Sequence, residues 1–176
     1  MASIAKELPI APTTPHLRPF DARRDLQAVA DLIELGFSDT LDEDGRRYLS
    51  QMRSAARSQH GLGWFGFSGF SAYQMMGYVW EETGQVIGNL SLIPYLMNGR
   101  RYFLIANIVV HPEHRRKGIG QALTCQGIEH ARRAASPAVW LHVRQENQAA
   151  IDLYEALGFC ERARRTTWTC QGDSPR

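Results

Sequence analysis

The feature that most constrains this chain is an apolar run at 104–110, LIANIVV, that leads directly into a cationic turn. A nearly unbroken apolar run of this kind is typical of a central strand buried on both faces. Three consecutive cations, 115–117, then precede Gly118 and Gly120, and helix-forming residues follow. A strand that ends in a glycine turn and opens a helix presents unpaired backbone N–H groups at the helix start. The order predicts a buried sheet with helices packed on it.

The cationic turn has the chemistry of a diphosphate site. The helix dipole places roughly half a positive charge at a helix start, and glycines let an anion approach the backbone closely. The mobile charges around it belong to Arg115, Arg116 and Lys117. A basic strand–helix turn whose glycines serve only its conformation is the alternative. There is no Gly-Lys-Ser/Thr run, and only two of the three glycines of the dinucleotide fingerprint are present.

The other segments predict an alternation of strands and helices without an internal repeat. Asp21 is a plausible helix cap, and tight hairpin turns are expected at Thr83-Gly84 and Asn98-Gly99. The expected strands are 16–20, 77–82, 85–95, 100–110, a buried strand at 138–143 and a last strand at 159–169. The expected helices are 21–37, 42–59, one that follows the turn to about Ala135, and 147–157.

Composition excludes several classes of protein. The 176 residues, 44% hydrophobic, are enough for one domain with a sizeable core. A net charge of +2 argues against a dedicated nucleic-acid binder. Three distant cysteines without metal-ligand spacing indicate reduced thiols in a cytoplasmic protein and no metal site. No run approaches the ~20 apolar residues of a membrane span, so membrane contact is not expected.

Two segments together resemble the signatures of one enzyme family. The stretch IVVHPEHRRKGIGQAL, 108–123, is similar to the acetyl-coenzyme-A signature of the GNAT N-acetyltransferases, Arg/Gln-x-x-Gly-x-Gly/Ala, with Arg115, Gly118 and Gly120 at the defined places. The segment NQAAIDLYEALGF resembles the second signature of that family. Its matching residues are Asn147, Ala150, Tyr154, Gly158 and Phe159. Within the family, the segment at 139–159 is most similar to the ribosomal-protein N-terminal acetyltransferases.

The resemblance implies an α/β fold of the GNAT type. Its mixed central sheet is expected to splay between the fourth and fifth strands, with helices on both faces. We expect the domain to span 16–170, with an extended arm at 1–15 and a short tail at 171–176. The family's final strand has no counterpart in that tail, so a homodimer through the open sheet edge or a second GNAT domain is a possible partner.

The resemblance also implies a site for acetyl-coenzyme A. The backbone of Ile108, Val109 and Val110 would pair with the pantetheine arm as an added strand does, and amides near Val109 would stabilise the oxyanion. The backbone amides that would hold the diphosphate are those of Arg116, Lys117, Gly118, Ile119, Gly120 and Gln121. Arg115 either steadies the loop or touches the ligand. Asn147 is a helix N-cap, a contact to the coenzyme arm, or both.

The catalytic residues implied by the resemblance are Tyr154 and His142. Tyr154 would donate a proton to the departing coenzyme thiolate, and its alternative is a core tyrosine on the apolar stripe of its helix. His142 stands where the ribosomal-protein enzymes usually carry a glutamate that acts as general base. A structural strand histidine and deprotonation relayed by water are the alternatives.

The function implied is direct transfer of acetyl from acetyl-coenzyme A to a primary amine, of a small molecule or a protein N-terminus. A GNAT domain that binds acyl-coenzyme A without turnover, as part of a larger or tandem protein, is the alternative. The acceptor cannot be named from these motifs. The aromatic run at 64–73 either lines the acceptor site or packs on the sheet.

Overall fold

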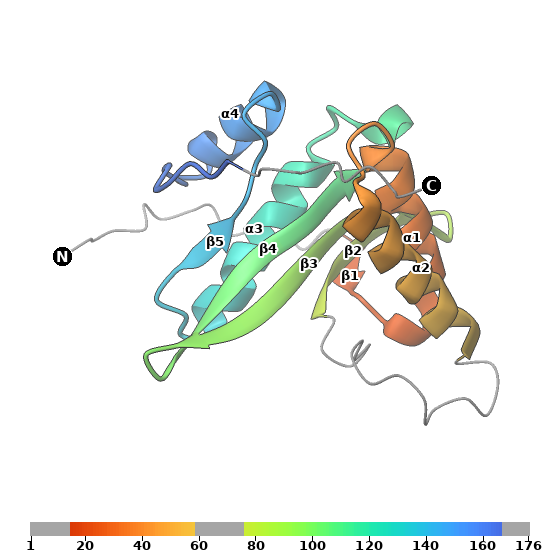
Figure 1. The fold of residues 1–176 in the computed structure, drawn as a ribbon, viewed down its shortest axis with the longest axis horizontal. Helices are drawn as coiled ribbons and strands as arrows, with labels where there is room; N and C mark the ends of the chain where they lie inside the picture. Colours follow the sequence, from red (N-terminus) through yellow and green to blue (C-terminus); the bar gives the residue numbers. More distant parts are fainter. Residues whose placement is uncertain (1–14, 59–75, 167–176) are drawn as a thin grey trace, which may run out of the picture.

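The structure is a computed structural model that describes residues 15–58 and 76–166 (Figure 1). Its elements are β1 (Leu17–Pro19), α1 (Ala22–Phe37), α2 (Glu43–Ser58), β2 (Met76–Glu82), β3 (Gln85–Met97), β4 (Arg100–Val110), the short 3-10 helix η2 (Pro112–His114), α3 (Ile119–Arg133), β5 (Val139–Leu141) and α4 (Gln148–Ala156). The expected arm up to residue 14, the aromatic run at 64–73 and the tail at 171–176 lie outside the described residues.

The five strands form one mixed sheet in the order β1-β2-β3-β4-β5. All neighbours are antiparallel except β4 and β5, which are parallel. The two predicted hairpin turns are confirmed, and each has positive φ at both central residues: Thr83 49° and Gly84 80°, then Asn98 52° and Gly99 72°. Turns of this sign match the right-handed twist of the strands they join.

Helices cover both faces of the sheet, as predicted (Figure 1). α1 and α2 pack on one face, with Leu26 and Met52 in their shared core. α3 packs on the other face, where Leu123 lies in a second core with Leu90 and Phe103. The sheet therefore separates two apolar cores, and its central strand is buried from both sides.

β4 changes the face to which its side chains point partway along its length. Phe103 and Ile105 belong to the core under α3, whereas Val109 belongs to the core under α1 and α2. In a regular strand, residues four apart point to the same face. The register between β3 and β4 shifts between Asn89 and Ser91, opposite Asn107, whose φ is 50°. This β-bulge inserts one residue and reverses the alternation.

The sheet opens between β4 and β5 beyond this point. β5 pairs with β4 only from Phe103, opposite Val139, to Ile105, opposite Leu141. The last five residues of β4, 106–110, extend beyond the pairing. The splayed mixed sheet predicted from the sequence is thus confirmed, and the opening begins at the bulge.

Two strand predictions were wrong in extent. The buried strand expected at 138–143 is reduced to β5, and Trp140 is 38% exposed because β5 is the edge strand in the described part of the chain. The strand expected at 159–169 is absent from its described part, up to residue 166. That segment is charged and exposed, and Arg164 pairs locally with Glu161 at 2.6 Å.

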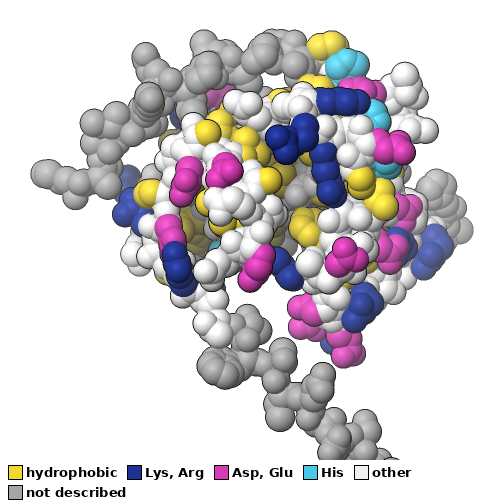
Figure 2. Space-filling view, turned by 90° about the horizontal axis from the view of Figure 1, so that it is seen from above, with side chains coloured by type: hydrophobic (Ala, Val, Ile, Leu, Met, Phe, Trp, Pro, Cys, Tyr) yellow, Lys and Arg dark blue, Asp and Glu magenta, His cyan; other side chains and the backbone are white. Residues whose placement is uncertain are grey.

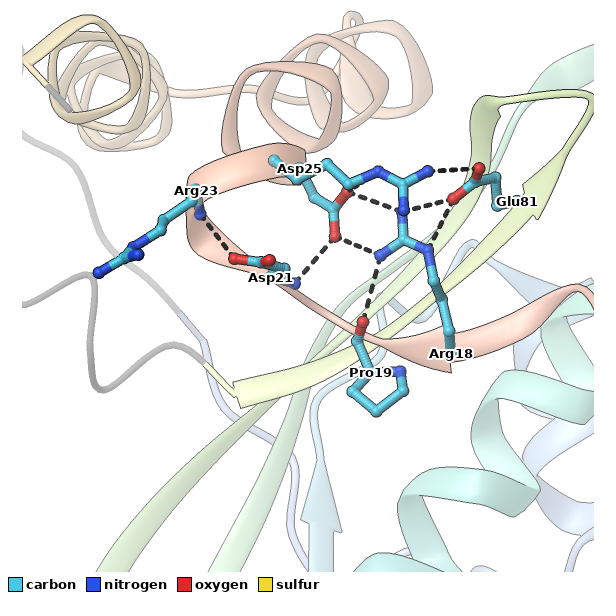
Figure 3. A network of polar contacts seen from close by, with 7 residues as sticks. Arg18, Pro19, Asp21, Arg23, Asp25 and Glu81 are labelled. Atoms are coloured by element: carbon cyan, nitrogen blue, oxygen red, sulfur yellow. Dashed lines mark hydrogen bonds and ion pairs between the residues drawn. The ribbon is translucent and has the colours of Figure 1, made fainter. Parts of the chain in front are cut away.

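A cluster of charged side chains ties β1, α1 and β2 together at the opposite edge of the sheet (Figure 3). The guanidinium of Arg18 donates to both oxygens of Asp25, at 2.6 and 2.7 Å, and to Glu81 at 2.6 Å. Asp25 is 1% exposed, so its charge depends on this partner. A cavity of about 470 Å³ lies beside the cluster. Because the acid and the bases there already neutralise one another, we regard this region as structural.

Within the described residues, no helix combines the length and apolar character needed to cross a membrane. The same residues contain no group of three or more potential metal ligands.

Candidate functional site

The turn between β4 and α3 exposes a run of unpaired backbone donors. The N–H of Arg115 donates to Pro112 at 3.3 Å, and the N–H of Ala122 donates to Gly118 at 3.0 Å. Between them, no backbone N–H donates to any group in the described chain. These six residues are Arg116, Lys117, Gly118, Ile119, Gly120 and Gln121. The sequence predicted this same set as the diphosphate cradle.

The backbone conformation makes this turn concave. Arg116 and Gly118 both lie in the left-handed region, with φ of 65° and 79°. Left-handed residues within a turn make successive N–H groups converge, which creates an anion-binding concavity. Gly118 is the N-cap of α3 and supplies no capping side chain, so the first N–H groups of the helix stay open. The geometry fits a multiply charged anion at the start of α3.

Gly120 brings three segments of the site together. A Cβ at this position would lie 3.7 Å from Leu153 of α4 and 3.8 Å from Val110 at the end of β4. Both are ordinary van der Waals distances, so packing within the protein does not require glycine here. The end of β4, the start of α3 and the helix that carries Tyr154 therefore meet at this residue.

Arg115 is engaged by the loop itself. Its Nε donates to the carbonyl of Val110 at 3.2 Å, which supports the alternative that it steadies the turn.

The N–H of His111 donates to Ile87 of β3 at 2.8 Å. Because backbone groups alternate sides along an antiparallel ladder, those of Val110 point away from β3, toward the side that β5 has left. The backbone of Val110 thus faces the opening, where an added strand-like ligand would lie.

The remaining cations of the turn lie at the surface. Arg116 and Lys117 are exposed and have no ion pair within the described residues. Figure 2 looks onto this end of the molecule and shows Lys and Arg side chains gathered close to hydrophobic ones. The turn therefore combines free positive charge with open backbone donors.

Asn147 and Tyr154 lie on α4. The side chain of Asn147 accepts from the N–H of Ala150 at 3.2 Å, so its role as N-cap is confirmed. Tyr154 is only 9% exposed, and its ring meets Phe159 edge to face at 5.8 Å. Burial raises the pKa of the Tyr154 phenol, and its hydroxyl has no hydrogen-bond partner among the described residues. Tyr154 is therefore a neutral phenol with a proton to give.

His142 differs from the prediction in its place. It lies one residue beyond β5 and is exposed, rather than within a buried strand. In the described part of the molecule, no hydrogen bond or ring contact joins His142 to Tyr154. The structure brings together the turn, the end of β4 and the helix that carries Tyr154, and it shows His142 only as an exposed side chain next to β5.

A second cavity, of about 250 Å³, lies between the two N-terminal helices and the bulge of β4. Apolar residues of α1 and the loop after it line one wall, and Tyr48 and Asn107 supply polar groups. Asn107 Nδ2 lies 3.4 Å from the Tyr48 hydroxyl, and burial raises the pKa of Tyr48. Arg144, beyond β5, donates to the carbonyl of Thr40 at 2.7 Å and closes one side of the cavity.

Asn89 stabilises the bulge of β4 that lines the second cavity. It lies in β3, is 1% exposed, and its Nδ2 donates to the Asn107 carbonyl at 2.9 Å. A bulge leaves a backbone carbonyl without its ladder partner, and a buried carbonyl without a donor is costly. Asn89 therefore compensates for the bulge. The sequence offered one signal for this pair, since each is an asparagine within an apolar strand.

Comparisons with known proteins agree with this geometry. The chain is 29% identical over 165 residues to a mycothiol acetyltransferase of Kocuria rhizophila. The aligned residues cover 88% of this chain and 50% of that protein. It is 46% identical over 55 residues to the ribosomal protein bS18-alanine N-acetyltransferase of Escherichia coli, covering 31% of this chain and 37% of that protein. The chain spans about half the length of the curated mycothiol relatives it matches.

Solved structures show the same fold. A GCN5-related N-acetyltransferase from Ralstonia eutropha superposes with a TM-score of 0.62 at 21% identity, covering 87% of this chain and 97% of that one. A model of the acetyltransferase (GNAT) family matches residues 35–159, which include the bulge, the turn and Tyr154. This chain belongs to the acetyltransferase (GNAT) family.

Proposed function

We propose that this protein transfers acetyl from acetyl-coenzyme A directly to a primary amine of a small molecule or a protein N-terminus. The observation that carries the proposal is the run of six unpaired backbone N–H groups at 116–121. It lies next to the end of β4 at Val110 and to the helix of Tyr154. The relatives named above, acetyltransferases of mycothiol and of a ribosomal protein alanine, support an amine as the acceptor.

The turn and β4 would hold the acyl donor. The N–H groups of 116–121 would receive the diphosphate of the coenzyme, with Arg116 and Lys117 adding charge. The amide-bearing arm would lie along the open edge of β4, at Ile108, Val109 and Val110, in place of the missing pairing with β5. Asn147, at the start of α4, is a further contact that we propose for this arm.

The chemistry would be a direct attack. The amine nitrogen forms a bond to the thioester carbonyl carbon, and the oxyanion that develops is stabilised by backbone N–H groups near Val109. The carbon–sulfur bond then breaks, and the thiolate takes the phenolic proton of Tyr154. The amine loses one proton, and the products are an N-acetyl amine and free coenzyme A.

The proton from the amine would go to His142 or to water. An unperturbed histidine has a pKa of ~6.5, against ~7.7–8.0 for an α-amino group and ~10.4 for lysine. The uphill step is smaller for an α-amine by about two to three pKa units. We therefore propose an α-amine as the acceptor of a histidine-assisted reaction.

We further propose the cytoplasm as the place of reaction, which suits the free thiols of Cys125 and Cys160.

The length of the relatives favours a second candidate function. Because the mycothiol acetyltransferases are about twice as long as this chain, such a domain can serve as the acyl-coenzyme-A-binding half of a larger protein without turnover of its own. Free thiol release from acetyl-coenzyme A, measured across amines, amino acids, peptides and aminoglycosides, tests both candidates. Amine-dependent release supports the enzyme, and tight binding of acetyl-coenzyme A without release supports the second candidate.

A further inference from the structure

The cavity of about 250 Å³ is formed by segments far apart in the chain. Ile33, Phe37 and Leu41 make an apolar wall. Asn107, at the bulge of β4, supplies its polar end, and Arg144 stands at its rim. Ligand pockets for drug-sized molecules usually measure ~300–1,000 Å³, so this one suits a smaller molecule. An apolar wall with one cation selects for a small ligand that has both an apolar part and an anionic part.

Arg144 is a cation without an acid partner among the described residues. One of its terminal nitrogens donates to the Thr40 carbonyl at 2.7 Å, and no other hydrogen bond or ion pair of its guanidinium occurs in the described chain. Arg53, by contrast, is bound to two acids, Asp31 and Glu34, at 2.6 Å each. Because a guanidinium carries five N–H donors in a planar fork, Arg144 keeps donors for a carboxylate.

The acid that lines the same cavity is already engaged. The Oδ1 atom of Asp42 accepts from the N–H of Gly45 at 2.8 Å, at the start of α2. The helix start partly neutralises this carboxylate, and no ion pair joins it to Arg144. The cavity therefore keeps a net attraction for an anion at the Arg144 rim.

The direction in which a ligand would lie follows from the proposed reaction. The thioester would lie where the sheet opens, at the bulge and the end of β4, so the reacting amine must approach Asn107 and Val110. The other end of the acceptor then reaches the cavity wall and Arg144. In a free α-amino acid, amine and carboxylate are attached to the same carbon, and an apolar side chain can fill the space along α1.

We infer that the acceptor is a free α-amino acid with an apolar side chain and that Arg144 selects it by binding its carboxylate. The inference rests on the proposed acetyl transfer and deepens it, because it names the acceptor class of the same site. Arg144 is then a specificity residue. An amino acid whose carboxylate is converted to an amide, or a peptide N-terminus, lacks a carboxylate on the carbon that carries the amine and is therefore a poor acceptor.

The test compares L-leucine with L-leucinamide, which differ in the carboxylate. For the wild-type protein and for Arg144→Gln, kcat/KM is measured for both acceptors by thiol release from acetyl-coenzyme A. Arg144→Gln is expected to lower the ratio of leucine to leucinamide by about tenfold to a hundredfold relative to the wild type, the range of a charge-assisted hydrogen bond. The variant should retain the activity with leucinamide. The change in the ratio is independent of the different basicity of the two amines.

Two variants control the experiment. Arg144→Lys keeps the charge but loses the fork, so it should restore part of the preference. Arg100→Gln removes an exposed arginine at the other end of β4 and should leave the ratio unchanged. An unchanged ratio in Arg144→Gln overturns the inference and leaves the acetyl transfer standing. So does acetylation of peptides or aminoglycosides but not of leucine, methionine or phenylalanine. Absence of transfer to every amine overturns both proposals.

Discussion

The cationic turn at 115–121 and the cavity near Arg144 present different kinds of chemical groups to a ligand. The turn offers backbone N–H groups, six in a row, and its cationic side chains either fold back, as Arg115 does, or are exposed, as Arg116 and Lys117 are. The cavity offers side chains: the amide of Asn107, the phenol of Tyr48 and the guanidinium of Arg144. The turn depends on backbone conformation, and the cavity depends on the identity of its side chains.

This difference explains what each region can do within one fold. Backbone donors are independent of most side chains, so many sequences can keep a common site for a common substrate. Side chains change with every substitution, so the cavity can be adapted to a particular acceptor. We therefore expect damage to the turn to abolish reaction with every acceptor. Damage to the cavity should change the preference among acceptors.

Gly120→Val should give the largest effect. A Cβ alone would meet Leu153 and Val110 at ordinary distances, so the fold should survive. We nevertheless expect the branched side chain to hinder the close approach of the diphosphate to this backbone. The loss of two charge-assisted hydrogen bonds, each worth about 1.5–3 kcal/mol, should weaken acetyl-coenzyme A binding more than a hundredfold. Calorimetry gives the affinity, and thermal unfolding gives the stability.

The matched control is Gly99→Ala, a glycine in the turn that precedes Arg100, at the other end of β4 from this site. Its φ of 72° should make the alanine destabilising, but acetyl-coenzyme A affinity should stay at the wild-type value. A Gly120→Val protein that binds with wild-type affinity would show that the backbone turn is not the cradle.

Tyr154→Phe should reduce kcat strongly and hardly change the affinity for acetyl-coenzyme A. General acid catalysis contributes ~10²–10⁴ in rate, and we expect the lower end because a thiol of pKa ~8.5 leaves fairly well unaided. Burial raises the pKa of Tyr154 above its ordinary value. The phenol is therefore protonated at neutral pH, and kcat should fall only above about pH 10.

That alkaline decline should be missing from the pH profile of the Phe variant. The same loss of rate is expected with every acceptor, because Tyr154 acts on the coenzyme side of the reaction. If turnover of Tyr154→Phe equals that of the wild type, Tyr154 is only a core residue.

Asn89→Ala should give an intermediate effect, because it acts on both sites through the bulge. Its amide donates to the Asn107 carbonyl at 2.9 Å in a fully buried place. An unsatisfied buried carbonyl costs about 1–3 kcal/mol, which chemical denaturation would measure. The bulge should also relax, and kcat/KM should fall about tenfold.

The control for this change is Ser91→Ala in the same strand. The hydroxyl of Ser91 lies 3.4 Å from Asn89 Nδ2 and 3.5 Å from Asn107 Nδ2, the long limit for a hydrogen bond, so its loss should cost less. Equal losses of stability and of kcat/KM in the two variants would contradict the positioning role of Asn89.

The sequence was sufficient to predict the glycine turn with its open N–H groups and most of the fold. A glycine turn, an apolar strand and a helix start each depend on a few consecutive residues, so the sequence can predict them. Gly118, with its positive φ, is such a turn residue. The reversal of faces in β4 was not predictable from the alternation of polar and apolar residues. The residues on both sides of Asn107 are apolar, so the sequence does not show where the strand changes its face. The cavity could not be predicted either, since Arg144 meets Thr40 across 104 positions of the chain.

The segment after α4 shows another limit of local pattern. The sequence predicted a strand at 159–169, yet its described part, up to residue 166, forms none. A strand needs a neighbour to pair with, and Arg164 is bound to Glu161 within the same segment instead. Pairing is a tertiary property, and it is not encoded in a single segment.

His142→Ala should give the smallest effect, and it tests whether any one side chain on the acceptor side is needed for proton removal. His142 is exposed and lies one residue beyond β5, where water can relay a proton in its place. We expect kcat/KM to fall by less than tenfold, well below the ~10²–10⁴ of a fully committed general base. If His142 is the base, the rising limb of the wild-type pH profile should be absent from the variant. A variant that keeps this limb would exclude His142 as the base, and the proton would then leave through water alone. The loss should appear with both leucine and leucinamide, because a proton must leave either amine.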